Sequence, residues 1–173
     1  MIFTGIKRKS NQLFFNKIIK EPTDVVSVSS TNKIKKILVL LDDITLKEEV
    51  VENLKTNLGF KKNAIEIITF LQKKTKDNDD NTVFSSKDFG WYGKVKNEEL
   101  KNILTKKYDL LINYSKVDNL YINLLLLQIK AAFKVGFAKL DNRFYDLLID
   151  CNTTEIALFN RELKKYLEIL NKV

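Results

Sequence analysis

Short apolar runs alternate with longer stretches of helical periodicity over most of the chain. The runs lie at residues 36–41, 64–71, 109–114, 133–137 and 146–151. Charged or turn-forming residues bound them, as expected for strands covered on both faces. Helical patterns lie at residues 45–58, 98–107 and 118–133, and a last one runs from a cap at Thr153 or Thr154 to Leu170. The alternation predicts an α/β fold: a mostly parallel open sheet with helices on both faces, a Rossmann-like three-layer sandwich whose strand order stays open.

The clearest unit is the stretch 108–138. A strand at 109–114, an apolar helix at 118–133 and a strand at 133–137 have the length of a parallel βαβ crossover, which is roughly 30 residues. The helix is apolar on nearly every face, so we expect it to be mostly buried. A membrane span needs roughly 18 uncharged residues. Three polar residues interrupt the run before that length, Asn123, Gln128 and Lys130. No transmembrane segment is therefore predicted.

Polar residues and glycines predict where several helices begin and end. Thr45 and Glu48 have the spacing of a capping box, and Gly59 suits the end of the helix that they would start. Asn97 is expected to cap the helix that starts at Glu98.

The amino-terminal 20 residues form a basic, amphipathic segment without an acidic side chain. Its basic residues are Lys7, Arg8, Lys9, Lys17 and Lys20. On a helix they flank an apolar stripe of Phe3, Ile6, Leu13, Phe14, Ile18 and Ile19. Because cations interrupt the apolar residues, the segment is not a secretory signal. Three uses remain open: a helix packed on the domain, an interfacial membrane helix, or a basic arm on RNA or a ribonucleoprotein.

A change of composition follows this segment. Residues 21–32, EPTDVVSVSSTN, are rich in Ser, Thr and Val and carry the only proline. They are interpreted as a linker between the basic segment at 1–20 and an α/β domain at 33–173.

Charge and composition restrict the chemistry of the chain. The net charge is +8, and residues 1–36 hold eight basic against two acidic side chains, so the excess lies mainly in the amino-terminal segment. The chain has no histidine and one cysteine, Cys151. This composition excludes His-dependent nucleophiles, structural zinc sites and an internal disulfide. It fits a reducing, cytoplasmic compartment. No cofactor is predicted, although an all-carboxylate magnesium site remains open.

Polar residues stand at the ends of three predicted strands. They are Asp42 and Asp43, Asn113 and Ser115, and Asp150. Ligands of parallel sheets normally bind beyond the carboxyl ends of the strands, so these five are candidate ligand-binding residues. The three aspartates could hold Mg²⁺ if their strands are adjacent. The alternative is that they cap helices and shape turns. Neither GxGxxG nor GxxxxGK[ST] is present, so a conventional dinucleotide or P-loop site is not predicted.

The motif DFGWYGK at 88–94 holds two of the five glycines and the only tryptophan. A functional interpretation has Trp91 and Tyr92 stacking on a base or sugar, with Lys94 on a phosphate. The structural interpretation, which we prefer, makes Gly90 and Gly93 turn or bulge positions and packs the aromatic residues across the domain.

Four stretches resemble an uncharacterised family of small proteins from Bacteroidota, a domain of unknown function. They are KDFGWYGKVKNEEL, KYDLLINYSKVDNLYINLL, KVGF and the closing YDLLIDCNTTEIALFNRELKKYLEILNKV. The resemblance covers most of residues 33–173 and extends to the basic segment. It implies an α/β body and a bacterial cytoplasmic or membrane-peripheral setting, and it transfers no activity and no site residues.

Residues 108–137 are also similar to a segment in the amino-terminal domain of heptosyltransferase-type glycosyltransferases. YDLLIN, an apolar helix and KVGF carry this local similarity. It implies shared Rossmann-like architecture, and fold analogy of this kind does not license function.

Two classes of function therefore remain. The leading hypothesis is a non-enzymatic α/β binding or scaffolding module that docks on an acidic surface through its basic segment. The alternative is a small Mg-dependent transferase or phosphohydrolase, which requires the carboxylates of Asp42, Asp43 and Asp150 to converge. If residues 1–20 instead pack on the body and complete its core or a homodimer, the docking hypothesis is weakened.

Overall fold

A parallel sheet of six strands forms the centre of the computed structural model, which describes residues 2–20, 33–75 and 81–173. The predicted linker at 21–32 and the side chain of Phe3 lie outside the described residues. The strands are β1 (Ile37–Leu41), β2 (Ile65–Phe70), β3 (Val83–Phe84), β5 (Leu110–Asn113), β7 (Lys134–Phe137) and β8 (Leu147–Ile149). Their order is β3-β2-β1-β5-β7-β8, and each neighbouring pair is parallel. Counted within this sheet, the order is the 3-2-1-4-5-6 of doubly wound folds.

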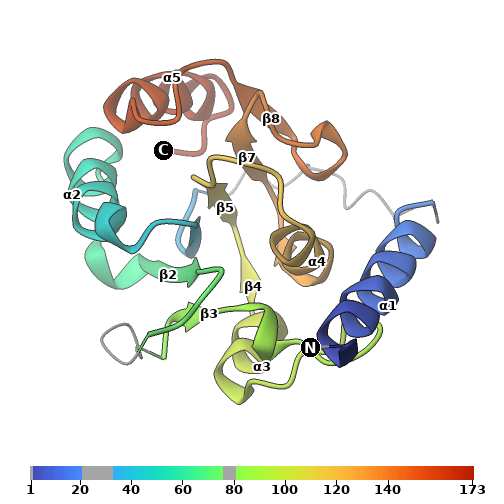
Figure 1. The fold of residues 1–173 in the computed structure, drawn as a ribbon. Helices are drawn as coiled ribbons and strands as arrows, with labels where there is room; N and C mark the ends of the chain where they lie inside the picture. Colours follow the sequence, from blue (N-terminus) through green and yellow to red (C-terminus); the bar gives the residue numbers. More distant parts are fainter. Residues whose placement is uncertain (1, 21–32, 76–80) are drawn as a thin grey trace.

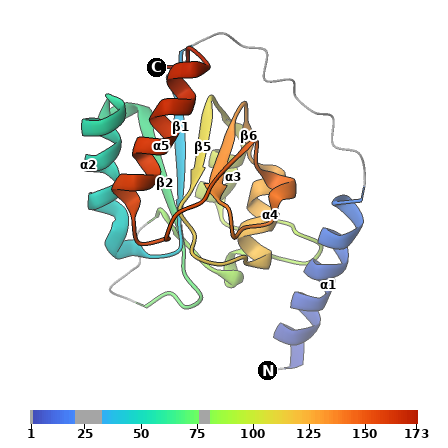
Figure 2. The same cartoon turned by 90° about the horizontal axis from the view of Figure 1, so that it is seen from above.

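Helices cover both faces of the sheet, which confirms the predicted three-layer α/β fold (Figure 1 and Figure 2). Two helices lie on one face, α2 (Lys47–Leu58) and α5 (Ile156–Ile169). The other face carries α3 (Glu98–Thr105) and α4 (Leu120–Gln128), and α1 (Ile2–Ile18) packs outside α4. The strands are buried on both sides, as their continuous apolar sequences predict.

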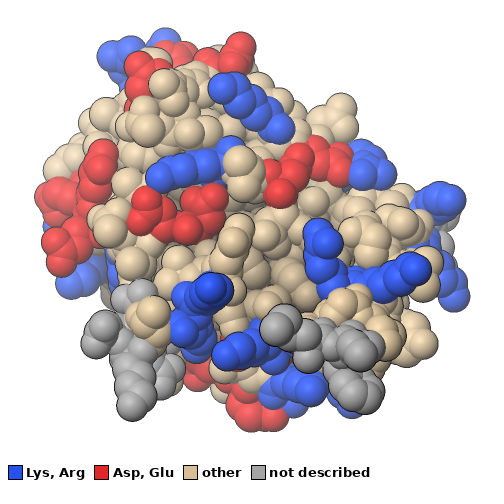
Figure 3. All heavy atoms as spheres, viewed as in Figure 1, with Lys and Arg blue, Asp and Glu red and all other residues tan. Residues whose placement is uncertain are grey.

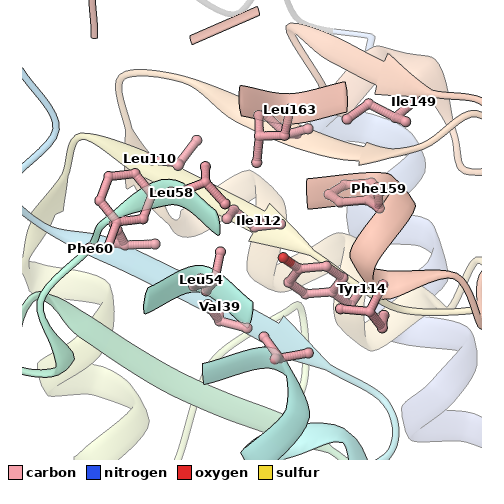
Figure 4. Close-up of a cluster of buried hydrophobic side chains, with 14 of the residues drawn as sticks. Val39, Leu54, Leu58, Phe60, Leu110, Ile112, Tyr114, Ile149, Phe159 and Leu163 are labelled. Carbon is pink, nitrogen blue, oxygen red and sulfur yellow. The ribbon is translucent and has the colours of Figure 1, made fainter. Parts of the chain in front are cut away.

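The core beneath α2 and α5 is the more uniformly apolar of the two layers. Val39 and Ile112 from the sheet meet Leu54 of α2 and Phe159 of α5, and all four side chains are fully buried (Figure 4). On the opposite face, Leu38, Leu40 and Leu111 pack beneath α3 and α4.

The predicted βαβ unit is confirmed, because β5 and β7 pair in parallel on either side of α4. The helix is shorter than predicted and ends at Gln128. Two residues later the chain forms β6 (Lys130–Ala131), which pairs with β4 (Lys107–Tyr108). Tertiary pairing thus overrides the helical pattern of the local sequence.

Two predicted helix starts are wrong. Asp43, not Thr45, provides the first cap: its carboxylate accepts from the Thr45 amide and starts a short 3₁₀ turn before α2. Neither Thr153 nor Thr154 caps α5, which begins after Glu155 without a side-chain cap. Gly59 does end α2 in a left-handed conformation, and Asn97 does cap α3 by accepting from the Leu100 amide.

The amino-terminal segment is a helix that packs on the domain. Phe15 is buried and its ring lies 6.0 Å from that of Phe144. Phe14, Ile18 and Ile19 are half-buried. The packed-helix interpretation of residues 1–20 is therefore correct for the described part of the segment. Among the described residues, no helix has both the length and the apolar content needed to cross a membrane.

Candidate functional site

The direction of strand addition reverses between β1 and β5, and this is where doubly wound sheets usually bind ligands. Four predicted site residues meet there, Asp42 and Asp43 after β1 and Asn113 and Ser115 at the end of β5. Lys116, which the sequence analysis did not single out, joins the two loops. Its amide donates to Asp42 Oδ2 at 2.7 Å, and its ammonium group donates to Asp43 Oδ2 at 2.9 Å.

The two adjacent aspartates have opposite electrostatic environments. Asp43 accepts hydrogen bonds from the Thr45 hydroxyl and from Lys116, and these lower the pKa of its carboxyl group to about 2. Burial raises the pKa of Asp42 above its ordinary value, against the opposing effect of the Lys116 amide. Both carboxylates thus connect loops, and Asp43 also caps a turn.

Asn113 and Ser115 form a second part of this strand-end network. Asn113 Oδ1 accepts from the Ser115 amide at 2.9 Å, and Asn113 Nδ2 donates to the Tyr145 hydroxyl at 2.6 Å. Asp42 Oδ1 and the Ser115 hydroxyl are buried and have no partner among the described residues. The network is held mainly by its own hydrogen bonds, which agrees with the turn-shaping interpretation.

Asp150 is not part of this network. It follows β8, which is separated from β1 by β5 and β7, or about 14 Å at the usual spacing of strands. The side chain of Asp150 is exposed. Within the described ranges, no group of three or more Asp, Glu, Cys or His side chains is placed to hold a metal ion. The three aspartates do not converge, so the condition for the magnesium-dependent enzyme is not met.

The DFGWYGK motif forms a tight hairpin beside α1. The Gly90 amide donates to the Lys94 carbonyl, and the Lys94 amide donates to the Trp91 carbonyl at 3.1 Å. Tyr92 and Gly93 have φ angles of 53° and 69°, as the two central residues of a type I′ turn require. The predicted turn role of Gly93 is confirmed. The predicted packing of the aromatic residues is wrong for Trp91 and Tyr92, which are 44% and 64% exposed.

Two polar residues of α1 hold the tip of this hairpin. Ser10 Oγ accepts from the Tyr92 amide at 3.1 Å, and Asn11 Oδ1 accepts from the Gly93 amide at 2.7 Å. Both side chains are buried. Sequence reasoning missed them, although a polar pair within the apolar stripe of an amphipathic helix was a visible signal.

The predicted docking cations divide into two groups. Lys7 donates to the carbonyls of Ser86 and Phe89 at 3.2 and 3.0 Å, and burial lowers its pKa. Lys7 therefore attaches α1 to the domain. The exposed cations of α1 are Arg8, Lys9, Lys17 and Lys20. In Figure 3 mostly basic side chains gather over α1 and the adjoining surface, whereas acidic and basic groups mix over α2 and α5.

Part of the predicted apolar stripe faces solvent instead of the domain. Ile6 is 50% and Leu13 is 63% exposed. Ser10 lies between them on the helix and meets the Tyr92 amide. We name Ile6, Lys9, Leu13 and Lys17 of α1, together with Trp91, Tyr92 and Lys94 of the hairpin, the outer face.

Comparison with known proteins gives a family and no activity. A family model described as "Family of unknown function (DUF6913)" matches residues 7–170. This confirms the coarser part of the resemblance, to an uncharacterised domain. No curated protein and no solved structure matches the chain.

Proposed function

The chain belongs to this family of unknown function, and we propose that it is a non-enzymatic α/β module that docks on an anionic membrane surface through its outer face. The observation that carries the proposal is the mixture of exposed apolar and basic side chains on α1 and on the hairpin that α1 holds. Ile6, Leu13, Trp91 and Tyr92 are exposed, with Lys9, Lys17 and Lys94 among them. An interfacial helix combines these properties: apolar groups enter the headgroup boundary while cations meet anionic lipid.

The aliphatic residues favour a membrane over RNA. Proteins bind single-stranded nucleic acid by stacking aromatic rings on bases and pairing cations with phosphates. Ile6 and Leu13 contribute to neither contact, whereas both gain from leaving water at a lipid interface. Trp91 and Tyr92 belong to the residue types that are enriched at the headgroup level of membranes.

The hairpin supports the proposal because its conformation is costly. Tyr92 is one of two non-glycine residues with positive φ among the described residues. Such a conformation is uncommon outside glycine and asparagine, and the hydrogen bond from the Tyr92 amide to Ser10 helps to hold it. The arrangement presents two large aromatic side chains to solvent beside α1.

The test is sedimentation of the full chain with vesicles of phosphatidylcholine, alone or mixed with phosphatidylserine. We expect binding to the anionic vesicles that weakens at high salt. Replacing Lys9 and Lys17 with Gln should lower the partition coefficient about 10- to 30-fold, since each lysine near an anionic surface contributes about 1 kcal/mol. Replacing Ile6 and Leu13 with Ser should lower it about tenfold or more on the same vesicles.

The matched control is Ile169→Ser with Leu170→Ser at the carboxyl end of α5, which removes two exposed apolar side chains outside the outer face. This variant should bind as the natural chain does. Equal losses in the control, or no binding to anionic vesicles, would contradict the proposal. Salt-sensitive binding to a single-stranded RNA without vesicle binding would favour the basic-arm hypothesis. A dimer in sedimentation equilibrium that the Ile6 and Leu13 substitutions dissociate would assign the outer face to a second copy.

A further inference from the structure

A small groove at the carboxyl edge of the sheet lies on the other flank of α1. It has a volume of about 270 Å³. Its lining comes from α1, the segments after β2 and β3, and the start of α4: Arg8, Phe70, Gln72, Ser86, Asn119 and Tyr121. At about 100° per residue, Arg8 lies on nearly the opposite side of the helix from Ile6 and Leu13. The groove is therefore distinct from the outer face.

The polar groups of the groove are largely free of protein partners. Within the described part of the chain, Arg8, Gln72 and the Ser86 hydroxyl make no side-chain hydrogen bond or ion pair. Asn119 uses its Oδ1 to cap α4 by accepting from the Tyr121 amide, and its Nδ2 donates to none of the residues that the structure describes. Among the described residues, the lining of the groove includes no carboxylate. By contrast, a groove between α2 and α5 contains Glu155, and a groove along α2 contains Glu48 and Glu52.

The groove is also held in place by named contacts. Lys7, next to Arg8, donates to the carbonyls of Ser86 and Phe89, which fixes this part of α1 over the segment after β3. Phe70 and Tyr121 form a floor, with their rings stacked 5.9 Å apart. A guanidinium group is thus brought to a strand-end groove by an element outside the sheet.

From this donor set we propose that the groove binds the phosphate group of a small soluble phosphate monoester. The Arg8 guanidinium can donate two parallel hydrogen bonds to two phosphate oxygens, and it can pair with a carboxylate in the same way. The remaining donors from Gln72, Ser86 and Asn119 call for further acceptor oxygens, which a monoester dianion provides and a carboxylate does not. The volume is near the lower end of the roughly 300–1,000 Å³ usual for ligand pockets, which favours a metabolite of a few carbons over a dinucleotide.

The test is a titration of the ¹⁵N-labelled full chain with glycerol 3-phosphate, followed by amide chemical shifts. We expect saturable shifts at Ser86, Lys87, Asn119 and Leu120. Glycerate, which carries a carboxylate on the same carbon skeleton, should bind at least tenfold more weakly. Arg8→Gln should weaken glycerol 3-phosphate binding at least tenfold. Lys9→Gln removes the same charge from the next residue, outside the groove, and should change the dissociation constant less than twofold.

A second variant keeps the inference testable if Arg8→Gln loosens α1. Gln72 is exposed, and Gln72→Glu places a carboxylate in the groove without touching the helix. It should weaken binding as strongly as Arg8→Gln, with the shifts of folded amides elsewhere unchanged. Equal affinity for glycerate, unchanged affinity in both groove variants, or shifts that do not saturate would overturn the proposal. None of these results bears on vesicle binding, which uses the opposite flank of α1.

Discussion

The helices α2 and α5 on one face of the sheet and the helix α1 on the other are attached by different kinds of contact. Beneath α2 and α5 the contacts are almost entirely apolar, and the few buried polar groups satisfy one another. The Tyr114 hydroxyl donates to Asn160 Oδ1 at 2.5 Å, and Asn160 Nδ2 donates to Asn53 Oδ1 at 3.1 Å. On the other face, α1 buries Phe15 and adds hydrogen bonds to the backbone of residues 86–93: Lys7 donates to two carbonyls, and Ser10 and Asn11 accept from two amides.

Because of this difference, we expect α2 and α5 to serve mainly the stability of the fold and α1 to serve mainly binding. Burial of aliphatic and aromatic surface is the main favourable term in folding, so α2 and α5, which each bury several apolar side chains, should contribute more to the free energy of unfolding than α1, where Phe15 is buried. The hydrogen bonds between α1 and the hairpin contribute less to the free energy of unfolding, but they fix the orientation of α1 on the domain. They place Arg8 in the groove and leave Ile6 and Leu13 in solvent. The α1 side is thus suited to binding, and changes there should leave the rest of the fold intact.

The largest effect should come from Phe159→Ala on the α2–α5 side. The Phe159 side chain is fully buried, with ring centroids 4.6 Å from Phe137 and 5.1 Å from Tyr114. Its truncation should lower the free energy of unfolding by about 3–5 kcal/mol in urea titrations, because a cavity adds to the lost burial. Phe15→Ala, the matched truncation on α1, should cost less than half as much. If the two losses are equal, α1 belongs to the main cooperative unit and the comparison fails.

The sequence predicted the central fold well because its parallel strands are buried on both faces. Such strands form continuous apolar runs, as in β1 and β5, and the long apolar pattern between β5 and β7 required a buried helix. The two-residue strands β3, β4 and β6 have no comparable signal. Their pairing depends on residues far away in the chain.

The candidate site was predictable only in part. Asp42, Asp43, Asn113 and Ser115 were found because strand ends meet at one edge of a parallel sheet. Asp150 also follows a strand, but the sequence left open whether that strand is adjacent to β1, since strand order is not encoded in local patterns. Lys116 and the Ser10–Asn11 pair were missed because their partners are set by tertiary structure. A type I′ turn leaves the amides of Tyr92 and Gly93 without partners inside the hairpin, and α1 supplies the acceptors.

Gly93→Ala should detach α1 while the sheet remains folded. A Cβ at Gly93 would lie 2.4 Å from Phe14 Cε1, and φ is +69°. We expect a loss of about 2–3 kcal/mol from clash and backbone strain, seen as faster hydrogen exchange of α1 amides. The control is Gly59→Ala, where φ is +72° and no heavy atom lies within 4 Å. It should cost about 1 kcal/mol, without an effect on α1. Equal exchange of α1 amides in both variants would contradict this assignment.

The smallest effect concerns pH and the strand-end network, which lies between the two sides. The folded-state pKa of Asp43 is about 2, below its ordinary value of 3.8, so this group stabilises the fold above pH 4 and loses that contribution as the pH falls towards 2. Asp43→Asn should therefore cost about 1 kcal/mol at pH 7, after allowance for solvent screening, and almost nothing at pH 2.

The pH dependence of stability that comes from Asp42 has the opposite sign. Burial raises its pKa, so its contribution is present at low pH and is lost as the pH rises. Asp42→Asn should accordingly be neutral or stabilising at pH 7. Urea unfolding of both variants between pH 2 and 7 measures the contrast, and parallel stability profiles would contradict the opposite environments of the two carboxylates.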